Sequence, residues 1–133
     1  MNVAELIKLV LIVLGVAASA SAGDPAVLTW YGSIEDGYLG ARHGASWHGD
    51  SCGLPEVVDL EGYGAAAPAW VPYCSRLLVC VGERCVVVVA VDRQRDDVLF
   101  GLAHLDLWPA PADALGVVGP GVVEGWFAVL PDL

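Results

Sequence analysis

The chain has 133 residues and a formal net charge of −10 at neutral pH, with six Lys and Arg against 16 Asp and Glu. Its length suits one small domain. So acidic a surface argues against nucleic acid and anionic membranes, both of which attract basic patches. The charge favours solubility and is compatible with a neutral ligand such as a glycan.

The first 22 residues are typical of a secretory signal. Leu9–Val16 is apolar apart from Gly15, and Ala20-Ser21-Ala22 places small residues before a cleavage point at Gly23. An uncleaved anchor is the alternative, although the apolar stretch is short for a bilayer span. We therefore expect a signal over 1–22, one domain over 23–133, a secreted or cell-envelope protein, and no lasting membrane association.

The rest of the chain has the pattern of short strands with one helix. Alternating or β-branched runs predict strands, and Pro at the start with Gly after the end predicts a helix. The expected strands are Val27–Tyr31, Arg76–Val81, Cys85–Val91, Val98–Leu107 and Val122–Val129. Gly32–Gly64 is expected to be mainly loop with short strands, and Ala65–Val71 is a small apolar stretch. Asp92–Asp97 is a charged connection, and the expected helix is Pro109–Leu115. This is the pattern of a small, mainly β barrel without repeats.

Four cysteines in an exported protein predict two disulfides. A two-residue turn at Gly82-Glu83, of type II′, pairs Val81 with Arg84 and places Cys80 opposite Cys85. That pair is the closer, non-hydrogen-bonded kind, within disulfide range. Cys52–Cys74 follows by elimination. A zinc site would need all four thiols to converge, which a cross-hairpin pair disfavours.

The segment around Asp106 is the strongest candidate for chemistry. His104 and Asp106 are two residues apart in an expected strand, so they share a face, while Leu105 and Leu107 point to the core. The alternative is a structural role, in which Asp106 is a carboxylate at the end of a strand that accepts hydrogen bonds from backbone N–H groups.

Several pieces of the chain, in this order and spacing, resemble the rare-lipoprotein-A-like double-psi β-barrels, relatives of expansins and family 45 endoglucanases. The pieces are Trp30-Tyr31-Gly32, Cys52-Gly53, Ala65–Ala67 leading to Cys74, the Cys80–Cys85 hairpin, Val91-Asp92-Arg93, and His104-Leu105-Asp106-Leu107 before Ala114-Leu115-Gly116. The resemblance covers Thr29–Val129. It implies a six-stranded double-psi barrel with a polysaccharide-binding groove in which Asp106 is the acidic residue.

Three departures from the family pattern bear on activity more than on fold. Trp108 stands where a serine commonly caps the helix, a loss of about 1 kcal/mol. Gln94-Arg95 replaces the usual glycine and proline, which changes the loop that faces the groove. The threonine-rich segment before the first cysteine is not recognisable in His43–Asp50.

Two kinds of glycan cleavage fit the candidate residues. Hydrolysis needs two carboxyl groups, and Asp92 is the best partner for Asp106, with a structural role as its alternative. A lytic transglycosylase needs one acid, which protonates the glycosidic oxygen and takes a proton from the sugar's 6-hydroxyl. The resemblance to rare lipoprotein A implies this second reaction, on peptidoglycan glycan strands. His104 is a further catalytic candidate that orients Asp106 or helps to bind substrate, and a packed or hydrogen-bonded neighbour is the alternative.

We expect Tyr31 to line the groove and Trp47, Trp70 and an exposed Trp108 to offer flat faces to sugar rings, with core packing as the alternative for each. We expect no metal at His43, His48 and Asp50, no cofactor, and a monomer. The alternatives to an enzyme are an expansin-like polysaccharide-binding or wall-loosening module and a disulfide-stabilised scaffold that binds a protein.

Overall fold

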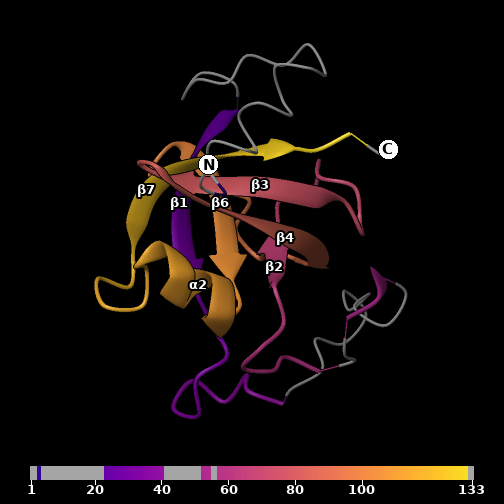
Figure 1. Ribbon diagram of the computed structural model, residues 1–133, viewed down its shortest axis with the longest axis vertical. Helices are drawn as coiled ribbons and strands as arrows, with labels where there is room; N and C mark the ends of the chain where they lie inside the picture. The colour runs from indigo at the N-terminus through magenta and orange to yellow at the C-terminus, as the bar shows by residue number, and fades with distance from the viewer. Residues whose placement is uncertain (1–2, 4–22, 41–51, 55–56, 132–133) are drawn as a thin grey trace.

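The computed structural model describes Val3 and residues 23–40, 52–54 and 57–131. The signal segment, Trp47, His43, His48 and Asp50 lie outside these residues. In chain order, with the labels of Figure 1, the elements are β1 (Asp24–Trp30), β2 (Gly64–Ala67), β3 (Arg76–Val81), β4 (Arg84–Arg93), β5 (Val98–Leu99), β6 (Leu102–Leu107), α2 (Pro109–Leu115) and β7 (Val123–Val129).

Six of the strands close into a mixed barrel. The order is β1-β7-β3-β4-β2-β6, and a further pairing of β1 with β6 completes the circle, while β5 pairs only with β6. The β1–β6 and β2–β4 pairs are parallel and the other pairs are antiparallel. Figure 1 shows α2 beside the ends of β1 and β6. The expected mainly β, six-stranded barrel with one short helix is confirmed.

The barrel interior is filled by alternate residues of its strands. Leu28 of β1, Leu77 of β3 and Leu105 and Leu107 of β6 have no exposed surface. Burial of each such side chain contributes about 2 kcal/mol. Because leucines leave β6 on the inner face, His104 and Asp106 leave it on the other, as the alternation predicts.

The β3–β4 hairpin has the predicted turn and register. Val81 pairs with Arg84 and Cys80 with Cys85. Gly82 has φ +58° and Glu83 keeps a negative φ, the combination of a type II′ turn. Both expected disulfides are present, with Cα–Cα distances of 4.2 Å for Cys80–Cys85 and 5.0 Å for Cys52–Cys74.

The single strand predicted over Val98–Leu107 is wrong. The chain reverses at Phe100 and Gly101, so that Val98 pairs with Ala103 in a small hairpin. Both turn residues have positive φ, 52° and 77°, as a type I′ turn requires. Gly101 was the sequence signal for this turn. The apolar Phe100 before it continues the pattern of a strand, so the sequence did not indicate that the strand ends there.

Two strands extend further than the sequence indicated, whereas the helix does not. β1 begins at Asp24 rather than Val27, and β4 continues to Arg93 rather than Val91, so Asp92 belongs to a strand. Helix α2 has the predicted bounds, its cap residue Trp108 provides no side-chain hydrogen bond, and Gly116 ends it with φ +75°. In the described part of the chain, no helix is long and apolar enough to cross a membrane.

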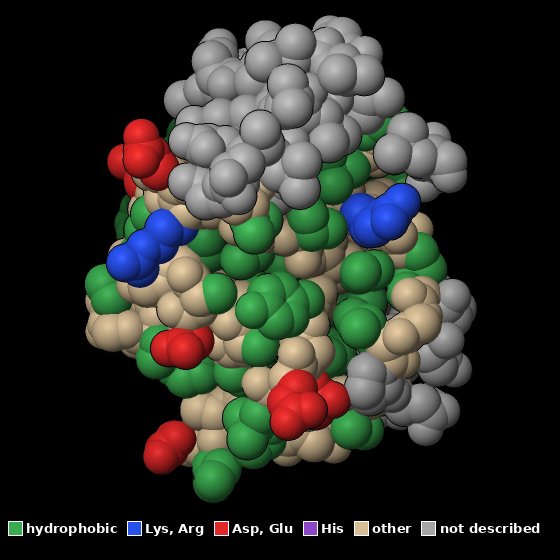
Figure 2. Space-filling view, viewed as in Figure 1, with side chains coloured by type: hydrophobic (Ala, Val, Ile, Leu, Met, Phe, Trp, Pro, Cys, Tyr) green, Lys and Arg blue, Asp and Glu red, His purple; other side chains and the backbone are tan. Residues whose placement is uncertain are grey.

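Acidic side chains are spread over the surface rather than gathered. On the face in Figure 2 they lie singly or in small groups between apolar side chains, and basic ones are few.

Candidate functional site

Four residues of adjacent strands form one row across the barrel wall. Asp92 of β4 pairs with Ala66 of β2, Ala66 pairs with Asp106 of β6, and Asp106 pairs with Thr29 of β1. Strands lie about 4.8 Å apart, so the backbones of the two aspartates are about 10 Å apart, with the small Ala66 between them.

A β-bulge creates this row. Ala65 pairs with Ala90, but the next residue, Ala66, pairs with Asp92, which leaves Val91 as the extra residue in β4. Without the bulge Ala66 would pair with Val91. The irregularity therefore turns Asp92 toward the side of the sheet that carries Asp106, a common use of bulges beside functional sites.

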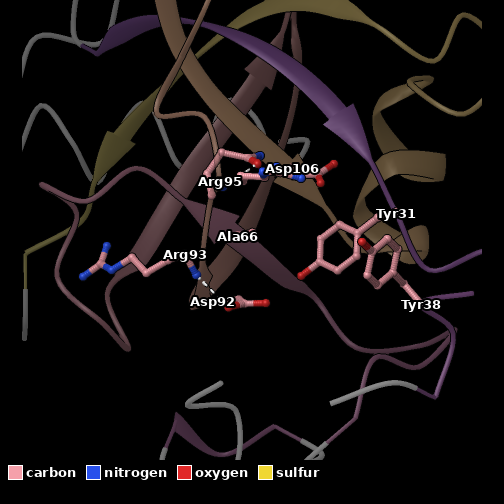
Figure 3. Close-up of a pocket in the computed structure, with 8 residues that line it drawn as sticks. Tyr31, Tyr38, Ala66, Asp92, Arg93, Arg95 and Asp106 are labelled. Atoms are coloured by element: carbon pink, nitrogen blue, oxygen red, sulfur yellow. Dashed lines mark hydrogen bonds between the residues drawn. The ribbon is translucent and has the colours of Figure 1, made fainter. Parts of the chain in front are cut away.

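An open pocket of about 130 Å³ lies over this row. Asp106, Asp92 and Tyr31 converge on it in Figure 3, with Ala66 as its floor. The remaining lining residues are Tyr38, Arg93, Gln94 and Arg95. The structure thus brings together Asp106, Asp92 and Tyr31, three of the residues singled out from the sequence.

The Asp106 carboxyl group is largely shielded from water. Burial raises the pKa of its carboxyl above the usual range, and the Asp36 carboxylate adds to the rise. The hydrogen bond from Thr29 (2.7 Å), the nearby His104 and the Gln94 amide offset part of it. Asp106 keeps its proton to a higher pH than an exposed aspartate, which is what an acid catalyst or a hydrogen-bond donor needs.

Tyr31 adds a hydroxyl that stays protonated. Its ring is buried, and burial raises the pKa of Tyr31 well above its usual value, with further increases from the negative charges of Asp92 and Asp106. The Trp108 indole N–H donates to the Tyr31 oxygen at 2.9 Å. The hydroxyl is thereby held in place at the pocket wall.

The expectation of an exposed Trp108 is wrong. Its side chain has no exposed surface and packs with Tyr31, Val58, Ala66 and Val91 beneath the pocket. A Cβ atom at Gly64 would lie 2.6 Å from the indole ring, so that glycine makes room for it. Trp108 therefore supports Tyr31 and offers no face to a sugar.

His104 lies behind Asp106 rather than in the pocket. Its Nε2 atom is 2.7 Å from the Thr29 hydroxyl, which also bonds Asp106, and its Nδ1 atom is 3.1 Å from the Asp96 carbonyl oxygen. The ring is buried and does not line the pocket. His104 is thus joined to Asp106 through Thr29, and its catalytic, orienting or packing role stays a prediction.

The pocket rim contains residues that sequence reasoning missed. The Asp36 carboxylate accepts N–H bonds from Gly32, Ser33 and Tyr38, which fixes the turn that carries Tyr38. The Tyr38 ring meets Tyr31 edge to face at 5.9 Å. Ser33 and Asp36, which are typical turn residues, were the sequence signal for an ordered loop. No feature of the neighbouring sequence indicated that this loop lies close to Asp106.

The loops after β2 and β4 are joined on the other side of the pocket. Arg93 points away from the carboxylates in Figure 3, stacks on Tyr73 at 4.0 Å and donates to the carbonyl oxygens of Pro68 and Val71. Trp70, in the loop so held, is 55% exposed but does not line the pocket. Gln94 places its side-chain amide in the pocket wall, close to the Asp106 carboxyl.

Among the residues that the structure describes, no three His, Cys, Asp or Glu side chains form a group that could hold a metal ion. The side chains that line the pocket supply carboxyl, phenol, amide and guanidinium groups.

Solved structures share this architecture. An expansin mutant from Clavibacter michiganensis in complex with cellohexaose superposes with a TM-score of 0.59 at 16% identity, covering 83% of this chain and 51% of that chain. The apo expansin gives 0.57 at 17% identity, with the same coverage. A Streptomyces papain inhibitor gives 0.50 at 20% identity, covering 76% and 86%.

The fold is the double-psi β-barrel. This chain spans about half the length of the expansin chains that it matches. No protein-family model and no curated protein matches it. The two disulfides place the domain among proteins of oxidising, extracellular environments.

Proposed function

We propose that this protein is an exported polysaccharide-binding domain whose binding groove is centred on the pocket of Asp106, Asp92 and Tyr31. One observation carries the proposal: two carboxyl groups and a phenol line one open pocket, in a barrel that is similar to about half of a Clavibacter expansin solved in complex with cellohexaose. Carboxylates accept hydrogen bonds from sugar hydroxyls, and Tyr31 and Gln94 donate to them.

The size of the pocket favours a polymer over a small molecule. Sites that enclose a drug-sized ligand have volumes of about 300–1,000 Å³, whereas this pocket has about 130 Å³. It admits one polar part of a longer chain that lies across the surface. Tyr38 lines the pocket and its half-exposed ring is a flat surface for a neighbouring sugar; the exposed Trp70 ring is a second aromatic surface, outside the pocket.

Cleavage of the bound glycan is a second candidate, favoured by the raised pKa of Asp106. In the lytic reaction the protonated Asp106 gives its proton to the glycosidic oxygen as that bond breaks. The sugar's 6-hydroxyl oxygen then bonds to the anomeric carbon, and its proton returns to Asp106. Hydrolysis would instead use Asp92 to activate water. The two-strand separation corresponds to the wider carboxyl spacing, about 6.5–9.5 Å, of inverting enzymes.

Binding and cleavage are separated by one set of incubations. The protein, Asp106→Asn and Asp113→Asn are mixed with purified peptidoglycan and with cellulose; bound protein is measured by sedimentation and soluble products by mass spectrometry. Asp113 is exposed on α2 and does not line the pocket, so its variant is the matched control.

We expect the wild type and Asp113→Asn to sediment with glycan and Asp106→Asn to bind about tenfold more weakly, the effect of one hydrogen bond of about 1.4 kcal/mol. Anhydro-sugar products from the wild type but not from Asp106→Asn would establish the lytic reaction. Absence of binding to either glycan would refute the proposal, and inhibition of a cysteine protease would then favour the protein-binding scaffold.

A further inference from the structure

Thr29 was not among the residues that the sequence singled out, yet it is the contact between His104 and Asp106. Its hydroxyl oxygen is 2.7 Å from His104 Nε2 and 2.7 Å from Asp106 Oδ1. The register that pairs Thr29 with Asp106 across the parallel β1–β6 strands fixes this position. The Asp96 carbonyl oxygen completes the line at His104 Nδ1.

A count of hydrogens limits how this line can be protonated. A carbonyl oxygen only accepts, so His104 Nδ1 must carry the hydrogen of the bond to Asp96. Thr29 has one hydroxyl hydrogen and faces two groups. If His104 were neutral and Asp106 ionised, both groups would need that single hydrogen, and one of the two short contacts would have no proton in it.

We infer that His104, Thr29 and Asp106 form a proton-sharing triad that holds one proton beyond the neutral ring and the ionised carboxylate. In one arrangement His104 Nε2–H donates to Thr29 and the Thr29 O–H donates to Asp106. In the other, Asp106 O–H donates to Thr29 and the Thr29 O–H donates to His104. The two differ by one proton moved along each short contact, and both keep all three hydrogen bonds.

The surroundings of the triad restrict further exchange of protons. Across the pocket lie Asp92, Tyr31 and Arg95, and Asp36 raises the pKa of Asp106 from the turn below. On the outer side, the Asp97 carboxylate accepts the Ala69 N–H. Loss of the shared proton breaks one short hydrogen bond, and gain of a second leaves the Thr29 hydrogen without its acceptor. The one-proton form is therefore the form in which all three hydrogen bonds are made.

The triad gives Thr29 and His104 the role of positioning residues. They keep a proton within reach of the Asp106 carboxyl at neutral pH, where an exposed aspartate is ionised. This consequence rests on the proposed function, whereas the shared proton itself is a property of the free protein and is measured without any glycan.

The test is an NMR titration of the oxidised protein, wild type, Thr29→Ser and Thr29→Val, that follows the His104 ring nitrogens and the Asp106 carboxyl carbon. The His104 signals are assigned by their loss in His104→Gln. In wild type and Thr29→Ser, both groups should follow the same two titration steps, because coupled sites share macroscopic steps. In Thr29→Val each group should follow one step of its own.

Separate single steps for the two groups in the wild type would overturn the inference, as would a common titration that persists in Thr29→Val. If Thr29→Val does not fold, the wild type and Thr29→Ser decide alone. A titration that is shared in a protein that binds no glycan would leave the triad intact and refute only the proposed function.

Discussion

Several side chains in this barrel have roles that cannot be predicted from the residue type alone. Trp108 replaces a helix-capping residue, but its indole is buried and donates to Tyr31. Thr29 is an ordinary strand residue that joins His104 to Asp106. In both cases the role of the side chain is determined by its contact with a residue that is distant in the sequence.

Trp108→Phe tests the support of the pocket. The change removes part of a buried ring and the hydrogen bond to Tyr31, so we expect the free energy of unfolding to fall by about 2–4 kcal/mol. Trp70→Phe, at an exposed position, should change it by less than about 0.5 kcal/mol. Urea titrations of both variants measure the difference, and equal effects would contradict the assigned burial.

The raised pKa of Asp106 predicts a pH dependence of stability. The folded state binds this proton more tightly than the unfolded state, so the slope of the unfolding free energy with pH is negative between the two pKa values. Relative to Asp106→Asn, the wild type should therefore lose stability as the pH rises from about 3.9 through the folded pKa, then stay level. Urea titrations at successive pH values measure this, and a difference that grows with pH would contradict it.

At the scale of elements, turns with special backbone angles explain which predictions succeeded. The β3–β4 hairpin, the Cys80–Cys85 bridge and helix α2 follow from Gly82, Pro109 and Gly116, which act over a few residues. The Val91 bulge does not, because it appears only when β2 pairs with β4. The convergence of Asp92 with Asp106 therefore needed the tertiary structure, although each residue was a candidate.

Gly82→Ala tests the turn against a matched glycine. A Cβ atom at Gly82 or at Gly119 would meet nothing within 4 Å, but only Gly82 has a positive φ, +58°. Alanine at Gly82 should cost about 1–2 kcal/mol of stability, because left-handed backbone disfavours a Cβ. Alanine at Gly119 should be neutral or stabilise by up to about 1 kcal/mol. Thermal unfolding compares the two, and a Gly119→Ala protein that is the less stable would contradict the turn assignment.

At the scale of the molecule, a small barrel with a modest core depends on its two disulfides. Cys52–Cys74 spans 22 residues and Cys80–Cys85 spans five. On the chain-entropy model their removal costs about 3 and about 2 kcal/mol. Replacing each pair by alanines and measuring unfolding in urea should give that order, and the reverse order would show that local strain or packing dominates.

The central claim is that the pocket of Asp106, Asp92 and Tyr31 is where a glycan chain lies. The most direct measurement is a backbone amide chemical-shift map of the protein titrated with soluble peptidoglycan fragments and, separately, with cellohexaose. The account predicts that at least one of these oligosaccharides shifts the amides of Tyr31, Ala66, Gln94 and Asp106 together, and much less so in Asp106→Asn. Shifts confined to other parts of the surface, or none with either sugar at millimolar concentration, would contradict it.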